Sequence, residues 1–212
     1  MDHPTDDELI TRVISGDENA LGEFFSRHRE RLWRMVNFRL DRRLYGRVDA
    51  DDILQEAYLD AVQRIKHYAA DPSRSFFIWL RLVVEQTLVD VHRRHLGAKM
   101  RDAKREVSRQ PRFSQATSMS LSFHLLAHLT SPSQAAMRAE ISNLLEEALE
   151  GMNAIDREVL ALRHFEELTN KEIAEVLGIE QKAASIRYVR AIGRLKDVLT
   201  QIPGFFDVTN PQ

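Results

Sequence analysis

A helix-turn-helix pattern near the C-terminus carries residue types that read double-stranded DNA. Ala174 is small where the two helices of such a motif cross, and Gly178 stands at the turn, where a left-handed backbone costs glycine little. The second helix, 181–199, is expected to turn five side chains outward: Gln181, Lys182, Ser185, Arg187 and Arg190. Three apolar residues are expected to clamp it onto its domain: Ile179, Ala184 and Ile186. Because Arg and Gln can read base edges while Lys and Arg hold phosphates, the pattern favours DNA binding over a plain helical hairpin.

Acidic residues gather where another helix begins: Asp49, Asp51, Asp52 and Glu56. Asp49 can cap this helix, and the other carboxylates can complement its dipole. They could also form half of a metal site, but no histidine stands at ligand spacing such as HExxH. A third interpretation is a docking surface, because Asp52, Gln55 and Glu56 share one polar face at spacings i, i+3 and i+4.

Aromatic and basic residues follow one another in the middle of the chain. Phe76, Phe77 and Trp79 come first, with Tyr68 just upstream. A nearly one-signed basic set follows: Arg81, Arg93, Arg94, Lys99, Arg101, Lys104 and Arg105. Bases stack on rings while cations hold the backbone, so this arrangement suits melted nucleic acid. For Phe76 and Trp79 alone, a place in the core is the favoured interpretation.

Charge is spread unevenly along a chain whose net charge is −2. Residues 90–112 contain eight Lys and Arg against three acids, and residues 179–196 contain five against one. Residues 138–167 contain eight acids against three Arg. Two basic patches on an acidic background indicate two separate contacts with a polyanion, the alternative being ordinary solvated helix faces.

Composition favours a soluble, helical protein and excludes several classes. The 212 residues are 43% hydrophobic and 29% charged, and Gly (8) and Pro (6) are both scarce, which argues against an all-β sandwich. Cys is absent, which excludes a disulfide scaffold and a thiol nucleophile. The chain has no run of about 18 apolar residues, so membrane insertion is not expected. The acidic N-terminus lacks the features of a signal peptide, so we expect a cytoplasmic protein.

Helical periodicity runs through most of the chain and predicts the elements that position these motifs. Thr5 and Glu8 form a capping-box pattern before a helix that ends near Gly16, and Ser75 is expected to cap the helix that carries the aromatic residues. The other predicted helices span 18–41, 49–67, a segment after Pro132 to Met152, a segment capped by Asp156 that ends near Phe165, and 170–177. The helix over 18–41 is predicted to bury one apolar stripe: Leu21, Phe24, Phe25, Leu32, Met35 and Val36. A polar loop is expected over 41–49. The buried stripe after Pro132 is predicted to be Met137, Ile141, Leu144, Leu145, Ala148 and Met152.

A Ser- and Thr-rich segment, 106–132, divides the helices into two groups and is predicted to be a linker. Its apolar residues between 121 and 129 are expected to form a short helix or to dock on a partner. The predicted fold is therefore all-α, with two small helical domains, 7–105 and 133–202, joined by a polar linker.

These motifs together resemble the extracytoplasmic-function (ECF) sigma factors of bacterial RNA polymerase, the smallest members of the sigma-70 family. Ala20–Val36 looks like the first conserved segment of that family, and Asp49–Ile65 looks like its polymerase-docking helix. Phe76–His95 looks like the helix that melts the promoter and reads the minus-ten element. The helix-turn-helix looks like the minus-thirty-five reader. Four motifs in this order over 7–196 make the resemblance specific.

The resemblance implies a protein with no catalytic site, metal or cofactor, whose partners are core RNA polymerase, promoter DNA and, in some members, an anti-sigma factor. The polymerase contacts it implies are Asp51, Asp52, Gln55 and Glu56. The minus-ten contacts are Tyr68, Ser73 and Arg74 in a loop, and Gln86, Asp90, Arg93 and Arg94 on the helix. The minus-thirty-five contacts are Lys171, Gln181, Lys182, Ser185, Arg187 and Arg190.

Departures from the family pattern fall on the DNA-reading positions. Gln86 replaces a frequent Asn, Glu85 a common Arg, and Ser185 a frequent Lys, so promoter preference does not carry over. Two other functions remain open at this point. One is a stand-alone helix-turn-helix regulator with a helical sensor domain, and the other is a helical enzyme that uses the acidic cluster on a metal.

Overall fold

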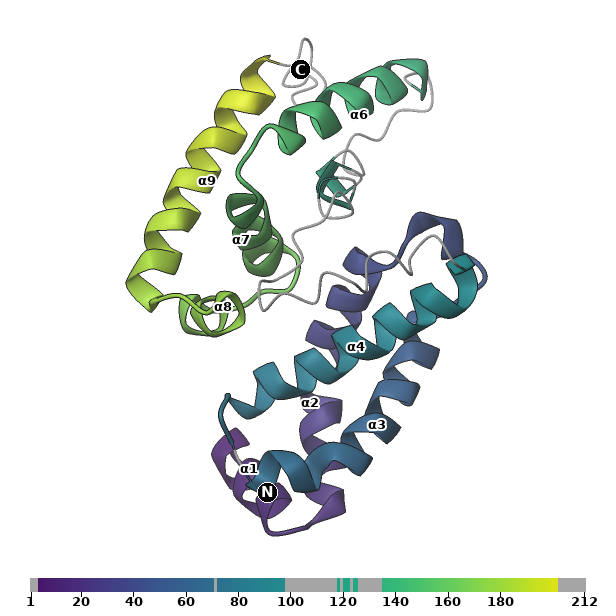
Figure 1. The fold of residues 1–212 in the computed structure, drawn as a ribbon, viewed down its shortest axis with the longest axis vertical. Coiled ribbons are helices and arrows are strands. Elements are labelled where there is room, and N and C mark those ends of the chain that lie inside the picture. Colours follow the sequence, from purple (N-terminus) through teal and green to yellow (C-terminus); the bar gives the residue numbers. More distant parts are fainter. Residues whose placement is uncertain are drawn as a thin grey trace. The chain divides into compact units, whose positions relative to one another are not determined.

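The computed structural model describes residues 4–70, 72–97, 118, 120–122, 124–125 and 135–201. All regular structure in these ranges is helical, which confirms the predicted all-α class. The chain divides into two units, Met1–Arg109 and Gln110–Gln212 (Figure 1). The basic stretch after Gly97 lies outside the described residues, as does most of the linker.

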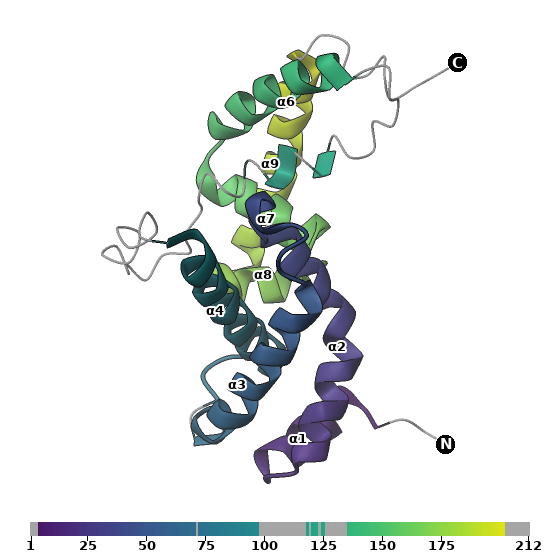
Figure 2. The same cartoon turned by 90° about the vertical axis from the view of Figure 1, so that its right-hand side faces the viewer.

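The first unit is a bundle of four α-helices: α1 (Asp6–Ile14), α2 (Glu18–Arg39), α3 (Ala50–Ala70) and α4 (Phe76–Leu96). Figure 2 shows α1 beside α2, and α3 and α4 pack against each other and against α2. The predicted capping box is present, because the Thr5 hydroxyl accepts from the Glu8 amide at 3.3 Å and the Glu8 carboxylate accepts from the Thr5 amide at 2.7 Å. Asp17 caps α2, because its carboxylate accepts from the amides of Asn19 and Ala20. Ser75 occupies the N-cap position of α4 as expected, but its side chain makes no capping hydrogen bond to that helix.

The core of this unit is built from the predicted apolar stripe of α2 and the first turns of α4. All six stripe residues are buried: Leu21, Phe24, Phe25, Leu32, Met35 and Val36. The Phe24 and Phe76 rings meet edge to face, with centroids 4.7 Å apart, so Phe76 belongs to the core. Each large side chain buried in this way contributes about 1.5–3 kcal/mol.

The connection between α2 and α3 is more ordered than the predicted polar loop. It contains a 3-10 turn, η1 (Arg42–Leu44), whose Leu44 is buried. The Asp41 carboxylate caps this turn by accepting from the Arg43 amide at 2.9 Å. The three apolar residues of this segment, Leu44, Tyr45 and Val48, are too few to show a helical period, so the turn could not be recognised from the sequence.

His92 of α4 holds this connection in place. Its Nε2 accepts a hydrogen bond from the Asp41 amide at 3.1 Å, so the ring must be neutral. Burial lowers the pKa of His92; the Asp41 carboxylate acts in the opposite direction, and the Arg43 guanidinium adds to the lowering. Protonation would therefore remove a hydrogen bond worth about 1 kcal/mol.

We expect the first unit to lose stability in mild acid through this histidine. The pKa of His92 is lower when folded than the unfolded value of about 6.5. Below pH about 6.5 the unfolded chain binds a proton that the folded chain does not, so the free energy of unfolding falls as the pH drops. Urea denaturation at pH 7.5 and pH 5.5 should show this fall, and His92→Gln, which keeps an acceptor, should reduce it. Burial also lowers the pKa of His28, so this second histidine should account for the part of the fall that persists in His92→Gln. An equal pH dependence in His92→Gln and the parent would contradict the assignment.

The second unit contains α6 (Ala135–Glu150), α7 (Ala154–His164), α8 (Asn170–Leu177) and α9 (Gln181–Gln201). Helix α9 packs against each of the other three. The predicted stripe on α6 is partly wrong: Leu144 is 39% exposed, and Leu149, which was not included, is buried. Met137 lies among residues whose side chains are not described. The few described residues of the predicted linker are helical; Leu121 is buried, and the Ser122 hydroxyl donates to the Ser142 carbonyl at 3.3 Å.

The cap of α7 differs from the prediction. Asn153 occupies the N-cap, and its side-chain oxygen accepts from the Ile155 amide at 2.9 Å. Asp156, the predicted cap, lies one turn further in and is buried, with its carboxylate on Arg194 and 3.6 Å from Arg187 of α9. A carboxylate removed from water in this way requires cationic partners, so Asp156 joins α7 to α9 instead of capping α7.

Candidate docking and nucleic-acid surfaces

The acidic cluster at the start of α3 serves two different roles. Asp49 caps the helix, because its carboxylate accepts from the Asp51 amide at 2.9 Å. We call the other three acidic residues and Gln55 the docking stripe: Asp51, Asp52, Gln55 and Glu56. Asp52 and Gln55 are exposed, while Asp51 pairs with Arg29 at 2.5 Å. The stripe therefore presents polar groups to the outside along the first two turns of α3.

A large apolar side chain continues the docking stripe, and sequence reasoning missed it. Leu59 is 61% exposed and lies four residues after Gln55, on the same helix face. The signal was present, because the buried residues Ile53, Ala57 and Ala61 leave Leu59 on the opposite side of α3. An exposed leucine bordered by carboxylates is suited to contact with a protein partner.

Glu56 connects the docking stripe to the basic end of α4. Its two carboxylate oxygens accept from the Arg94 guanidinium at 2.9 and 2.6 Å, a bidentate pair between residues 38 positions apart. Both side chains are about half exposed. An exposed pair of this kind contributes about 0–1 kcal/mol, so either group can exchange its partner at low cost.

A hollow of about 260 Å³ lies between α3 and α4. It is lined by Arg64, His67, Trp79, Leu82, Val83 and Gln86. Trp79 offers an aromatic wall, and Gln86, which accepts a hydrogen bond from Arg64, brings amide groups to the rim. Stacking on a ring and hydrogen bonds to edges are what a nucleobase removed from its duplex requires. Sequence reasoning found Gln86 but missed Arg64 and His67, whose i, i+3 spacing on the face toward α4 was the available signal.

The predicted minus-ten residues do not form one continuous surface. Gln86 and Asp90 are exposed on α4, and Arg93 pairs with Asp90 at 2.6 Å. Ser73 and Arg74 are exposed in the segment before α4. Tyr68 is corrected: it lies on α3 rather than in the loop and is buried, with its hydroxyl donating to the Arg74 carbonyl at 2.9 Å. Its ring packs against both Phe76 and Trp79, so it supports the loop from inside.

The helix-turn-helix has the expected backbone. A capping box of Thr169 and Glu172 begins α8, and Gly178 ends it in the left-handed conformation, with φ +64° and ψ +36°. Ala174 is buried where α8 meets α9, and its carbonyl accepts from the Ile179 amide at 3.0 Å. Ala184 and Ala191, seven residues apart, are the buried residues of α9. Figure 1 shows α8 at the N-terminal end of α9.

Two of the residues predicted to point outward from α9 are bound to neighbours. The Ser185 hydroxyl accepts from the Asn170 side-chain amide at 2.9 Å and donates to the Gln181 carbonyl at 3.2 Å. Arg187 is half-buried beside Asp156. Gln181, Lys182 and Arg190 are exposed as predicted, and so is Lys171 on α8.

The prediction that Ile186 clamps α9 onto its domain is wrong, because this side chain is exposed. It is 42% exposed, and Val189, one turn further, is 69% exposed. Ala184 and Ala191 mark the buried side of α9, and Ile186 and Val189 fall on the other side. Ile179 is half-buried and Ala184 buried, in keeping with their predicted role.

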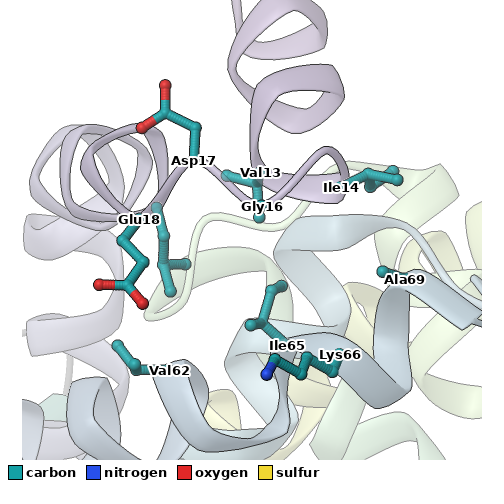
Figure 3. A pocket seen from close by; sticks show the side chains of 10 residues that line it. Val13, Ile14, Gly16, Asp17, Glu18, Val62, Ile65, Lys66 and Ala69 are labelled. Atoms are coloured by element: carbon teal, nitrogen blue, oxygen red, sulfur yellow. The ribbon is translucent and has the colours of Figure 1, made fainter.

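A small hollow of about 110 Å³ lies where α1 and α2 meet α3 (Figure 3). Its lining is mostly apolar, with Val13, Val62 and Ile65, and Glu18 and Lys66 stand at its edge. Ligand pockets usually measure about 300–1,000 Å³, so this space does not suit a nucleotide or an organic cofactor. Within the described ranges, no group of three or more His, Asp or Glu side chains is placed to hold a metal ion.

None of the helices that the structure describes is long and apolar enough to cross a membrane.

Known proteins similar to this chain match it over most of its residues. Residues 7–197 match the family model described as ECF sigma factor. The ECF RNA polymerase sigma factor SigD of Mycobacterium tuberculosis is 28% identical over 191 residues, covering 90% of this chain and 82% of SigD. The RNA polymerase sigma-H factor of Pseudomonas aeruginosa is 25% identical over 190 residues, covering 88% and 89%. The structure of CnrH in complex with the cytosolic domain of CnrY has the same fold, with a TM-score of 0.51 at 20% identity over 92% of this chain and 97% of CnrH.

Proposed function

The chain belongs to the ECF sigma factor family, and on that premise we propose which of its surfaces bind polymerase and which bind promoter DNA during transcription initiation. It is a sigma factor that binds core RNA polymerase and directs transcription to start at particular promoters. We assign it no catalytic chemistry of its own and place it in the cytoplasm, where polymerase and promoters meet. The proposed domains are 7–105 for docking and melting and 133–202 for upstream recognition, with 106–132 as the linker that follows the polymerase surface.

The docking stripe is proposed to bind the polymerase. Asp51, Asp52, Gln55 and Glu56 present carboxylates and an amide beside the exposed Leu59, which supplies an apolar centre. The observation that carries the proposal is the Glu56–Arg94 pair, because it places the docking stripe directly beside the basic end of α4. One helical unit can therefore hold polymerase and promoter at the same time.

The face of α4 and the hollow beside it are proposed to receive the melted minus-ten element. Arg93 and Arg94 would hold the backbone, and Ser73 and Arg74 would contact it from the segment before α4. A base turned out of the duplex would enter the hollow against Trp79, where Gln86 would reach its edge. Asp90 is proposed to orient Arg93, to which it is already paired. Tyr68 is left with a supporting role only.

Helix α9 is proposed to enter the major groove of the minus-thirty-five element. Its N-terminal end offers Gln181 and Lys182, with Arg190 two turns later, and Lys171 on α8 would hold a phosphate. Ser185 and Arg187 would act mainly by orienting α9, because one is bound to Asn170 and the other stands beside Asp156.

An anti-sigma protein is proposed as a further partner. The similar fold of CnrH was determined with a protein partner, the cytosolic domain of CnrY. This chain exposes Leu59 in one unit and Val189 in the other, and a protein that covered such surfaces would keep polymerase or promoter away.

Removing the exposed polar side chains with which α9 is proposed to read DNA should weaken use of the upstream element. A base contact by arginine discriminates by about 1–3 kcal/mol, whereas a phosphate contact weakens all sequences alike. We expect Lys182→Ala, Gln181→Ala and Arg190→Ala each to lower run-off transcription from promoters that need the element. At least one of them should relax the preference across single-base variants.

Lys196→Ala is the matched control for this series, since it removes one exposed cation about 21 Å beyond Lys182 and about 9 Å beyond Arg190 along the same helix. Arg187→Ala should lower transcription partly through stability, because Asp156 is buried and would keep only Arg194. An unchanged preference profile in all the α9 variants would disprove sequence reading by α9.

A further inference from the structure

Two apolar side chains lie on the face with which α9 is proposed to read DNA. Ile186 is 42% exposed and Val189 is 69% exposed. At about 100° per residue, these two positions and the exposed cations Lys182 and Arg190 fall within an arc of about 100°. The buried residue Ala184 marks the opposite side of the helix.

The fold gives no reason for these residue types. Isoleucine and valine are β-branched, which slightly disfavours a helix compared with straight-chain residues. Neither side chain is buried among the described residues, so leaving them in water forgoes the free energy of burial. Their place on the helix is therefore best explained by an apolar group that arrives from outside.

We propose that Ile186 and Val189 recognise thymine methyl groups in the upstream promoter element. This inference rests on the proposed role of α9 as the upstream reader and adds the bases that it selects. An apolar side chain can neither donate nor accept a hydrogen bond, and the one apolar group on a base edge in the major groove is the C5-methyl of thymine. The exposed cations Lys182 and Arg190, which precede and follow the two residues along α9, suit the phosphates of a duplex and would set the register of the helix.

The spacing of the two residues limits where the thymines stand. Three residues of α-helix rise by about 4.5 Å, and successive bases of one strand rise by about 3.4 Å. The two contacted thymines should therefore lie within about two base pairs of each other.

The test replaces thymine by deoxyuridine, which keeps every hydrogen-bonding atom of the base and lacks only the methyl group. The full chain is reconstituted with core polymerase, and a promoter is first identified by run-off transcription. The upstream element of that duplex promoter is then randomised, and the sequences that the holoenzyme binds are selected. We expect the selected sequences to contain thymines at two nearby positions. Deoxyuridine at either should weaken holoenzyme binding about fourfold, the value of one buried methyl group.

The variants assign the contacts to individual side chains. Ile186→Ala and Val189→Ala should each bind thymine and deoxyuridine equally at one of the two positions. Ile192→Ala is the matched control, because Ile192 is 37% exposed on the same helix but lies off this face. It should keep the full discrimination.

Equal binding of thymine and deoxyuridine by the parent would overturn the inference. If Lys182→Ala and Arg190→Ala still weakened binding to the upstream element in that case, the proposed role of α9 would stand without it. The inference would also fail if Val189→Ala lowered the affinity for core polymerase and left the base preference unchanged, since the face would then bind protein. If no α9 variant changed upstream binding, the proposed role of α9 would fall with it.

Discussion

Reversing two charges of the docking stripe, with Asp52→Lys and Glu56→Lys together, is expected to weaken binding to core RNA polymerase by about 100-fold or more. Like charges placed against a complementary surface cost several kcal/mol, and each 1.4 kcal/mol is a factor of ten. The fold should survive, because Asp52 is exposed and Glu56 is half exposed. Titration of a fluorescently labelled chain with core polymerase measures the dissociation constant, and circular dichroism checks the fold.

Two controls separate docking from general charge. Asp7→Lys with Glu23→Lys makes the same change in net charge on α1 and α2, away from the stripe, and should bind within about threefold of the parent. Arg94→Ala removes the partner of Glu56 and measures what the lost pair contributes alone. If the stripe variant bound core polymerase as tightly as the parent, the docking assignment would be wrong.

Removing Gln86, Arg93 and Arg94 together, each to Ala, is expected to reduce promoter opening by about tenfold or more while the closed complex partly remains. Opening exposes bases and backbone that these side chains are proposed to hold, whereas the closed complex also depends on α9 and on polymerase. Permanganate reactivity of unpaired thymines reports opening, and a mobility-shift assay at low temperature reports the closed complex. The ratio of the two signals is the quantity that should fall.

The matched control for this variant is Arg12→Ala with Arg27→Ala, which removes the same positive charge from partly exposed arginines of α1 and α2. It should leave the ratio unchanged. Equal loss of the closed complex and of opening in the triple variant would contradict the division of labour between the units.

The features of this fold that could be predicted are those determined by a few residues close together in the sequence. The capping box of Thr5 and Glu8, the α2 stripe and the left-handed Gly178 depend on residues close in sequence, and all are present. The order of the acidic helix α3, the helix α4 with its aromatic and basic residues, and the helix-turn-helix followed from such local patterns, which is why the sequence resembled the family.

Contacts between distant residues could not be predicted, because they depend on which helix faces meet. Asp156 reaches Arg194 and Glu56 reaches Arg94, each across 38 residues. Tyr68 looked like a loop residue until the ring packing of Phe76 and Trp79 enclosed it. Ile186 matched a clamp by type alone, and only the observed burial of Ala184 and Ala191 placed it on the exposed side.

Run-off transcription with purified components tests the central claim most directly. Core RNA polymerase is incubated with genomic fragments in the presence and absence of this chain, and transcript starts are mapped. The account predicts discrete new starts that require both the chain and the polymerase, and that disappear with Asp52→Lys and Glu56→Lys. A transcript pattern that the chain leaves unchanged, together with tight binding to a palindromic duplex without polymerase, would instead identify a stand-alone regulator.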